Sequence, residues 1–303
     1  MRERIGFTAK DGTKLYGYRW DAKAPKAAVV IVHGMAEHCV RYDRFATALN
    51  EVGYSAMALD LRGHGMSAQS GIKGYFAKKD GWKVVLGDIK GFVDFAKEAY
   101  PGIPIVMFGH SMGSIFARVY ISEHGQDISA CILSGVTINK KGLRDVAPFI
   151  TKLVSVFNPK KPSKMLDSMS FGAFNKPFEP ARTKFDWLSR DEAEVDKYVE
   201  DEMCGFVCTA PLFGDVSRAI LFTLKEENVN KIPKDLKVFI VSGEKDPVGS
   251  NGYDAKYLYD SYTKSGLDAE YKIYKDARHE LLNETNREEV MADILSFLES
   301  AIA

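Results

Sequence analysis

Residues 103–113 read IPIVMFGHSMG, and this stretch decides the fold class. The run IPIVMF is continuously apolar, as in a strand that is buried on both faces, and GHSMG follows it without a spacer. A strand that turns sharply into a helix strains the backbone of its central residue, and glycines two positions to either side avoid a collision there. The stretch therefore predicts that Ser111 lies on a tight strand-to-helix turn, with its hydroxyl held clear of the backbone.

Apolar runs of the same kind recur along the chain, where AAVVIV, YSAMALD, ISACILSG and LKVFIVSG alternate with segments of helical period. Continuous apolar strands that alternate with helices indicate a mostly parallel sheet with helices on both faces. Near the beginning, LYGYRW follows a turn at Asp11-Gly12, which predicts an antiparallel hairpin at the sheet edge. A final strand AEYKIYK and a helix around REEVMADILSFLES complete an α/β fold with eight strands.

The segment between Ser134 and Leu236 breaks this rhythm, because it contains helical patterns and loops but no convincing buried strand. We interpret residues 137–222 as a helical cap that is inserted into a core domain of residues 1–136 and 223–303. One helical stripe of the cap is apolar and comprises Val146, Phe149, Ile150, Leu153, Val154 and Phe157.

The second half of the cap contains a helix-start signal. Ser189 and Glu192 have the spacing of a capping box, in which each side chain satisfies a free amide of the other residue. We therefore expect a helix to start at this motif.

The charge of the cap is uneven, with basic residues in its first part and acidic residues in its second. A basic amphipathic helix can rest on a lipid interface, so weak contact with a membrane surface through the cap is one interpretation. The alternative is that the stripe is the buried side of a lid helix and the charges are its solvated side. The basic residues are Lys140, Lys141, Arg144, Lys152, Lys160, Lys161 and Lys164.

Composition excludes several classes of protein. Of 303 residues, 46% are hydrophobic, enough for a large core, and Lys plus Arg equals Asp plus Glu at 41 each, so we expect no nucleic-acid partner. Apolar runs far shorter than the roughly 20 residues of a membrane span, and charges within MRERIGFTAK, favour a cytoplasmic protein. The four cysteines form no C-x-x-C pair, so we expect neither a disulfide framework nor a zinc site. Nothing in the sequence calls for a metal or an organic cofactor.

Ser111 can act as a nucleophile only beside a neutral imidazole that a carboxylate orients. In hydrolases with a serine on this turn, the chain order is Ser, then Asp or Glu, then His. Only His279 lies after Ser111 by more than one helix, in the loop between AEYKIYK and the last helix. For the carboxylate we favour Asp246, which follows the strand LKVFIVSG, while Glu244 and Asp276 remain alternatives.

The attack of a serine on a carbonyl also needs donors for the oxyanion. The backbone amide of Met112 suits this role, because it follows the nucleophile at a helix start. A second amide is expected from Met35, in the loop after AAVVIV, where Gly34 lets the loop approach the turn closely. We expect His33 to pin this loop.

The motifs GHSMG, HGMAEH and DLRGHG, followed by Asp246 and His279, resemble the α/β-hydrolases of the monoacylglycerol lipase and lysophospholipase group, a serine aminopeptidase S33-like family. The resemblance covers nearly the whole chain. It implies Ser111, Asp246 and His279 as the catalytic triad and the amides of Met35 and Met112 as the oxyanion hole. It also implies a cap, inserted after the sixth strand, that forms an acyl channel.

The resemblance also bears on the polar end of the site. Glu37 and Arg41 match residues that shape this end in monoacylglycerol lipases, although a structural ion pair under the loop is an equal alternative. Leu282 stands where the animal enzymes carry a second histidine near the glycerol.

The sequence thus predicts a serine carboxylester hydrolase that acts through an acyl-enzyme on a small-molecule, lipid-like ester with one acyl chain. The alternatives are a thioesterase or acyltransferase with the same triad, or a non-catalytic ligand-binding member of the fold.

Overall fold

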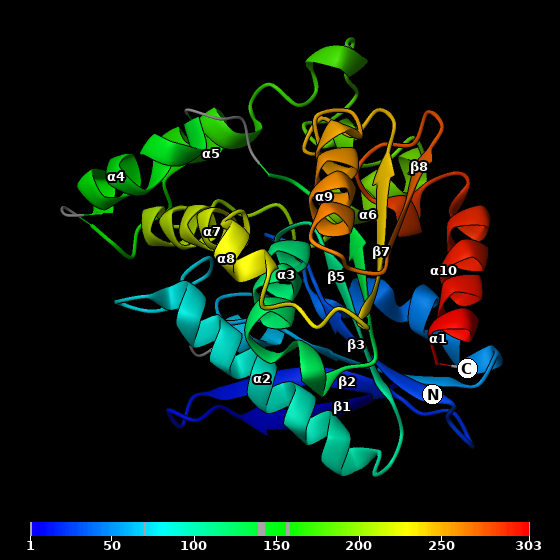
Figure 1. The fold of residues 1–303 in the computed structure, drawn as a ribbon. Coiled ribbons are helices and arrows are strands. Elements are labelled where there is room, and N and C mark those ends of the chain that lie inside the picture. Colours follow the sequence, from blue (N-terminus) through cyan, green and yellow to red (C-terminus); the bar gives the residue numbers. More distant parts are fainter. Residues whose placement is uncertain (1, 70, 139–142, 156–157, 303) are drawn as a thin grey trace.

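The computed structural model describes residues 2–69, 71–138, 143–155 and 158–302. It contains one eight-stranded sheet with the order β1-β2-β4-β3-β5-β6-β7-β8, as expected for an α/β-hydrolase (Figure 1). The strands are β1 (Arg2–Thr8), β2 (Lys14–Trp20), β3 (Ala27–Val32), β4 (Tyr54–Leu59), β5 (Ile105–His110), β6 (Ala130–Ser134), β7 (Lys237–Gly243) and β8 (Ala269–Tyr274). The α-helices are α1 (Asp43–Glu51), α2 (Gly81–Ala99), α3 (Met112–His124), α4 (Leu143–Ser155), α5 (Lys164–Phe171), α6 (Glu192–Glu200), α7 (Ala210–Thr223), α8 (Glu226–Val229), α9 (Tyr253–Lys264) and α10 (Arg287–Ile302).

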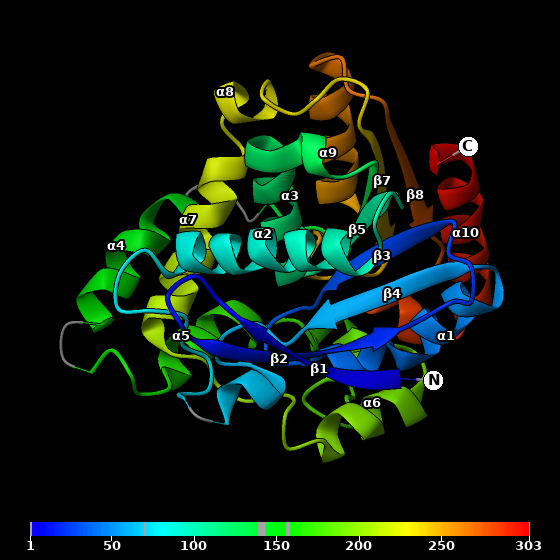
Figure 2. The same cartoon turned by 90° about the horizontal axis from the view of Figure 1, so that it is seen from below.

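The sheet is mostly parallel and has an antiparallel edge. β1 pairs with β2, and β2 with β4, in antiparallel fashion, which confirms the predicted hairpin. All other neighbours are parallel. Side chains of each central strand alternate between two buried cores, because successive residues point to opposite faces of a sheet. In β3, Val30 packs in the core with α2, α3 and α9, while Val29 and Ile31 pack in the core with α1 and α10 (Figure 2).

The direction in which the strands are added reverses at β3. The chain passes from β3 to β4 on one side and then returns to β5 on the other side. In open α/β sheets, the carboxyl ends of strands at such a reversal form a crevice for ligands. Val32 pairs with Gly109 there, so the loops after β3 and β5 leave the sheet side by side.

The cap lies between β6 and β7, and α4 and α5 extend away from the sheet (Figure 1). Arg118 of α3 contacts the chain at both ends of this insertion. Its fully buried guanidinium donates to the carbonyl of Thr137 (2.7 Å) and to the hydroxyl of Thr223. Thr137 and Thr223 lie at the two ends of the cap that the sequence predicts. The division of the chain into a core and a cap of residues 137–222 stays a prediction.

The apolar stripe of the cap is only partly buried. Ile150 and Val154 pack against the core, but Phe149 is 65% exposed and Leu153 is 54% exposed. The interpretation of the stripe as the buried side of a lid helix is therefore wrong for these two residues. Phe157, and the side chain of Val146, lie outside the described part of the chain.

The predicted capping box is also wrong in detail. The helix α6 begins at Glu192, and its N-cap is Asp191, whose carboxylate accepts hydrogen bonds from the amides of Ala193 and Glu194. The hydroxyl of Ser189 instead donates to the carbonyl of Asn283 (2.8 Å), a long-range partner that a local motif does not reveal.

No helix in the described ranges is long and apolar enough to cross a membrane.

Candidate active site

Ser111 occupies the strained turn that the glycines predicted. Its φ is +53° and its ψ is −118°, between the end of β5 and the start of α3. A Cβ atom on Gly113 would lie 2.0 Å from the carbonyl oxygen of Val32, and one on Gly109 would lie 2.6 Å from the carbonyl oxygen of Gly113. Both glycines are thus required by packing as well as by the turn itself.

His279 and Asp246 are hydrogen bonded. Nδ1 of His279 lies 2.9 Å from Oδ2 of Asp246, and both side chains are buried. Asp246 leaves the end of β7, and His279 lies in the loop between β8 and α10. The two alternative acids contact each other instead, since the carboxylate of Glu244 accepts the amide N–H of Asp276 (3.0 Å). Of the three candidate carboxylates, Asp246 is the one hydrogen bonded to His279.

Two opposing effects set the pKa of His279. Burial lowers the pKa, because the imidazolium loses solvation, but the charge and hydrogen bond of Asp246, together with the charges of Glu280 and Glu37, raise it above that of an unperturbed histidine. The ring of His110 lies 4.8 Å from that of His279, and burial followed by repulsion from His279 lowers the pKa of His110 to about 4. His110 is therefore neutral at pH 7 and adds no second positive charge at this site.

Two adjoining cavities reach Ser111, with volumes of about 390 Å³ and about 310 Å³. The larger one also contains His279, Glu37 and several polar side chains at the cap. The smaller one is lined mainly by apolar residues of the cap and of α3, among them Ile115, Leu166 and Phe213. Ser111 and His279 thus share a cavity wall, although the described residues include no hydrogen bond between these two side chains.

The loop after β3 lies against the turn of Ser111. A Cβ atom on Gly34 would lie 3.3 Å from Cβ of Ser111, which confirms the expected close approach. His33 contacts the carbonyl of Gly34 through Nδ1 (2.7 Å) and accepts the amide N–H of Leu61 through Nε2 (3.0 Å), so it holds the loop. Met35 lines both cavities.

Met112 is the first residue of α3 and lines the apolar cavity. A helix start leaves backbone N–H groups without helical partners, and the helix dipole favours negative charge there. The amide of Met112 therefore lies in a position that suits an anion.

Glu37 and Arg41 belong to a buried ionic network. Arg41 donates to Glu37 (2.8 Å) and, through both terminal nitrogens, to Glu280 (2.7 and 2.6 Å). Burial of Glu37 raises its pKa, but Arg41, His110, His33 and the amide N–H of Gly34 together outweigh this effect, so the net pKa is lowered. Glu37 also accepts the amide N–H of Gly34 (2.5 Å) and lines the larger cavity. The network therefore links the loop after β3 to the residue that follows His279.

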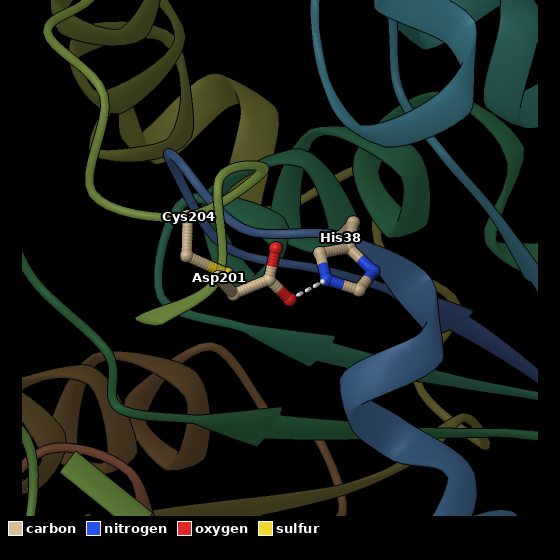
Figure 3. Close-up of side chains that lie close together, drawn as sticks. All are labelled: His38, Asp201 and Cys204. Atoms are coloured by element: carbon tan, nitrogen blue, oxygen red, sulfur yellow. Dashed lines mark hydrogen bonds and ion pairs between the residues drawn. The ribbon is translucent and has the colours of Figure 1, made fainter. Parts of the chain in front are cut away.

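One cluster beside this network contains side chains of the kind that bind metals. His38, Asp201 and Cys204 bring ring nitrogen, carboxylate oxygen and sulfur within 4.8 Å of one another (Figure 3). However, Nε2 of His38 is already paired with Asp201 (2.7 Å), and burial raises the pKa of the Cys204 thiol well above its usual range. The cluster is accounted for as a hydrogen bond between the cap and the loop after β3, next to a protonated thiol.

His64, in the DLRGHG motif, has a structural role in its loop. Its Nδ1 contacts the carbonyl of Arg62 (2.9 Å), and its ring packs against those of Phe76 and Phe206. Burial lowers the pKa of His64 to about 3, so that the ring is neutral.

Three residues around His279 were missed by the sequence reasoning. The ring of Trp187 lies 5.4 Å from the imidazole, Glu280 binds Arg41, and the carboxylate of Glu284 accepts the amide N–H of Arg278 (2.8 Å). The acidic spacing in HELLNE could have drawn attention to the two glutamates. No local signal marks Trp187, which comes from the cap.

The eight-stranded, mostly parallel sheet, with a serine turn at the strand reversal, defines this protein as an α/β-hydrolase. A family model described as "Serine aminopeptidase, S33" matches residues 23–286, and the chain belongs to this family. This result confirms the resemblance stated from the sequence motifs.

Relatives are found over almost the whole chain. It is 27% identical to the monoacylglycerol lipase of Mycolicibacterium smegmatis, over 99% of this chain and 98% of that protein. It is also 27% identical to the monoglyceride lipase of Homo sapiens, over 90% of this chain and 82% of that protein. A thermostable carboxyl esterase from Bacillus coagulans, solved with glycerol, superimposes with a TM-score of 0.90 at 25% identity, over 100% of this chain and 99% of that one. The chain is therefore a hydrolase by family, and the relatives that match almost its whole length are named as lipases and an esterase.

Proposed function

We propose that this protein is a serine carboxylester hydrolase that acts through an acyl-enzyme on lipid-like esters with one acyl chain, as monoacylglycerol lipases do. Ser111 is the nucleophile, and His279 takes its proton, passes it to the leaving alcohol and then activates water. Asp246 orients the imidazole, and the amides of Met35 and Met112 stabilise the oxyanion. Glu37 and Arg41 shape the polar end of the site. Localisation in the cytoplasm stays a prediction from the sequence.

The observation that carries the proposal is the strained turn of Ser111 on a cavity that also contains the His279–Asp246 pair. Backbone strain of this kind persists only where the surrounding structure maintains it, and it is concentrated at functional sites. A non-catalytic ligand-binding member of the fold would need neither the strain nor the buried pair. The geometry therefore favours an enzyme over a binding protein.

The two cavities support a lipid-like substrate. The apolar cavity suits an acyl chain, because it is lined by side chains such as Leu166, Phe213 and Ile220. The cavity on the His279 side contains Glu37, Asp167 and Lys184, and it suits a polar alcohol or head group. A carbonyl between the two cavities would lie beside Ser111.

Labelling and hydrolysis test the proposal directly. A fluorophosphonate should label the protein but not Ser111→Ala, and that variant should lose roughly 10⁶-fold in kcat. Ser122→Ala is a matched control, because it removes a buried serine hydroxyl that donates to the carbonyl of Arg118 within α3, and Ser122 lines neither cavity. Equal labelling of the protein and Ser111→Ala would reject the proposal.

A substrate panel separates the proposed ester hydrolase from the same machinery acting on another bond. The panel contains monoacylglycerols, lysophospholipids and p-nitrophenyl esters of graded chain length, beside acyl-CoA. Monoacylglycerols should give the highest kcat/KM. A clear preference for acyl-CoA would instead indicate a thioesterase or acyltransferase.

Contact of the cap with a membrane surface is also part of the proposal. In α4, Phe149 and Leu153 are each more than half exposed, and in α5 so are Met165 and Met169; Lys152 and Lys164 are their neighbours in the sequence. Apolar side chains next to lysines suit an anionic lipid interface. Co-sedimentation with liposomes should rise with the anionic lipid fraction and fall in a Phe149→Ser, Leu153→Ser double variant. Co-sedimentation that does not depend on anionic lipid would reject this contact.

A further inference from the structure

The loop that carries His279 is hydrogen bonded to the cap on both sides of the imidazole. Just before it, the amide N–H of Arg278 donates to Glu284, and the guanidinium of Arg278 donates to the carbonyl of Ser189 (3.1 Å). Just after it, the amide N–H of Glu280 donates to the carbonyl of Leu188 (2.8 Å). The cap segment of residues 186–190 therefore runs along the loop of His279 as a single hydrogen-bonded unit.

Glu284 lies at the centre of this unit. Its carboxylate is fully buried, and Oε1 accepts the amide N–H groups of Arg278 (2.8 Å) and Arg190 (3.1 Å). Oε2 accepts Nε of Arg190 (2.8 Å) and the amide N–H of Thr285 (2.8 Å). A buried carboxylate is stable only when it is paired and hydrogen bonded in this way. The arginine comes from the cap, so a cap residue fixes the backbone next to His279.

We propose that Arg190 and Glu284 are positioning residues, through which the cap holds the imidazole of His279 in reach of Ser111. The inference rests on the proposed function, since it takes His279 as the general base. A base must lie within hydrogen-bond distance of the proton that it removes, and a misplacement of about 1 Å costs about 100-fold in rate. A small change in the loop of His279 would therefore affect the chemical step more than the binding of substrate.

Two substitutions test this role, and a third is the control. Arg190→Ala removes the partner of Glu284 from the cap, where Arg190 is 30% exposed, and Glu284→Gln replaces the buried carboxylate by an amide of the same shape. Arg44→Ala is the control, because it breaks another ion pair between core and cap, to Glu194 (2.6 Å), away from the loop of His279. A general loosening of the cap would affect all three variants.

Two measurements separate positioning from loss of stability. In steady-state kinetics, Arg190→Ala and Glu284→Gln should each lower kcat by about 10 to 100-fold and leave KM within about 3-fold. In proton NMR, the downfield resonance of Nδ1–H of His279, hydrogen bonded to Asp246, should shift or disappear in both variants and persist in Arg44→Ala. The NMR measurement needs no substrate, so it tests the arrangement independently of the proposed reaction.

The outcomes distinguish this inference from the proposed function. If Ser111→Ala abolishes hydrolysis while Arg190→Ala keeps both kcat and the resonance, the inference fails and the proposed function stands. If Ser111→Ala remains active, the proposed function fails, and the resonance alone still decides whether Arg190 positions His279. An equal loss of kcat in Arg44→Ala would also overturn the inference. Should Glu284→Gln not fold, the partly exposed Arg190 still provides the test.

Discussion

Ser111 and His279 reach the same cavity from two regions that are held in different ways. Ser111 is held by the backbone, between Gly109 and Gly113, and its own amide N–H donates to the carbonyl of Ser134 (2.9 Å). His279 is held mainly by side chains, including Asp246 and Glu284. Substitutions of the two glycines at the serine turn should therefore act mainly on folding, whereas those around the histidine should act mainly on catalysis.

After the loss of the nucleophile in Ser111→Ala, the largest expected effect is that of Asp246→Asn. The asparagine keeps the shape of the side chain but cannot hold the imidazole in the required tautomer, so kcat should fall by about 10⁴-fold. Because the change is nearly isosteric, the midpoint of urea unfolding should move little. Glu244→Gln is the matched control, since its carboxylate contacts the amide of Asp276 and is 45% exposed; it should keep full activity. An active Asp246→Asn would show that another acid orients His279.

The next effect in size is that of Gly113→Ala on folding. The added Cβ atom would lie 2.0 Å from the carbonyl oxygen of Val32 and 2.7 Å from that of His33, both backbone atoms that cannot move aside easily. We expect a loss of about 3 kcal/mol in the free energy of unfolding, at the upper end of overpacking costs. Urea unfolding followed by circular dichroism measures this loss.

The control for Gly113→Ala is another helical glycine. Gly87 of α2 is exposed, and no atom lies within 4 Å of the position of an added Cβ. Gly87→Ala should therefore stabilise the protein by about 0.5 to 1 kcal/mol. Equal losses in the two variants would contradict the steric account of the serine turn.

We expect pH to have a smaller and graded effect on kcat/KM. His279 must be neutral to accept the proton of Ser111, and burial lowers its pKa less than Asp246, Glu280 and Glu37 together raise it. The value of kcat/KM should therefore rise through an apparent pKa above 6.5 and then level, with about a tenfold loss per pH unit below the midpoint. Asp246→Asn should move the midpoint to lower pH. A flat profile between about pH 5 and 8 would contradict a titrating base.

The core of the fold could be predicted from the sequence because its determinants are local. Apolar runs such as AAVVIV are buried on both faces of the sheet, and the glycines of GHSMG are needed within one turn of Ser111. The order of Ser111, Asp246 and His279 along the chain follows from the order of the strands that carry them. For these features, the residue type and the spacing along the chain are enough to predict the structure.

The packing of the cap could not be predicted in the same way, because it depends on contacts between distant segments. Helical periodicity identified the stripe of α4, but it did not show that Phe149 faces away from the core. Trp187 lies against His279, and Ser189 donates to the carbonyl of Asn283, although 94 residues separate this last pair. Such partners depend on where the cap packs against the core. The residues next to Trp187 and Ser189 in the sequence do not indicate that position.

The smallest expected effect tests the corrected start of α6. The carboxylate of Asp191 accepts hydrogen bonds from the amides of Ala193 and Glu194 and also pairs with Arg287 (2.7 Å). Asp191→Ala should therefore lower the free energy of unfolding by about 1 kcal/mol, whereas Asp191→Asn, which keeps an N-cap acceptor and loses only the half-buried ion pair, should lower it by a few tenths. If the helix instead began with a capping box at Ser189, Asp191→Ala would cost no more than Asp191→Asn. Urea unfolding of the two variants, measured side by side, decides between these two starts of the helix.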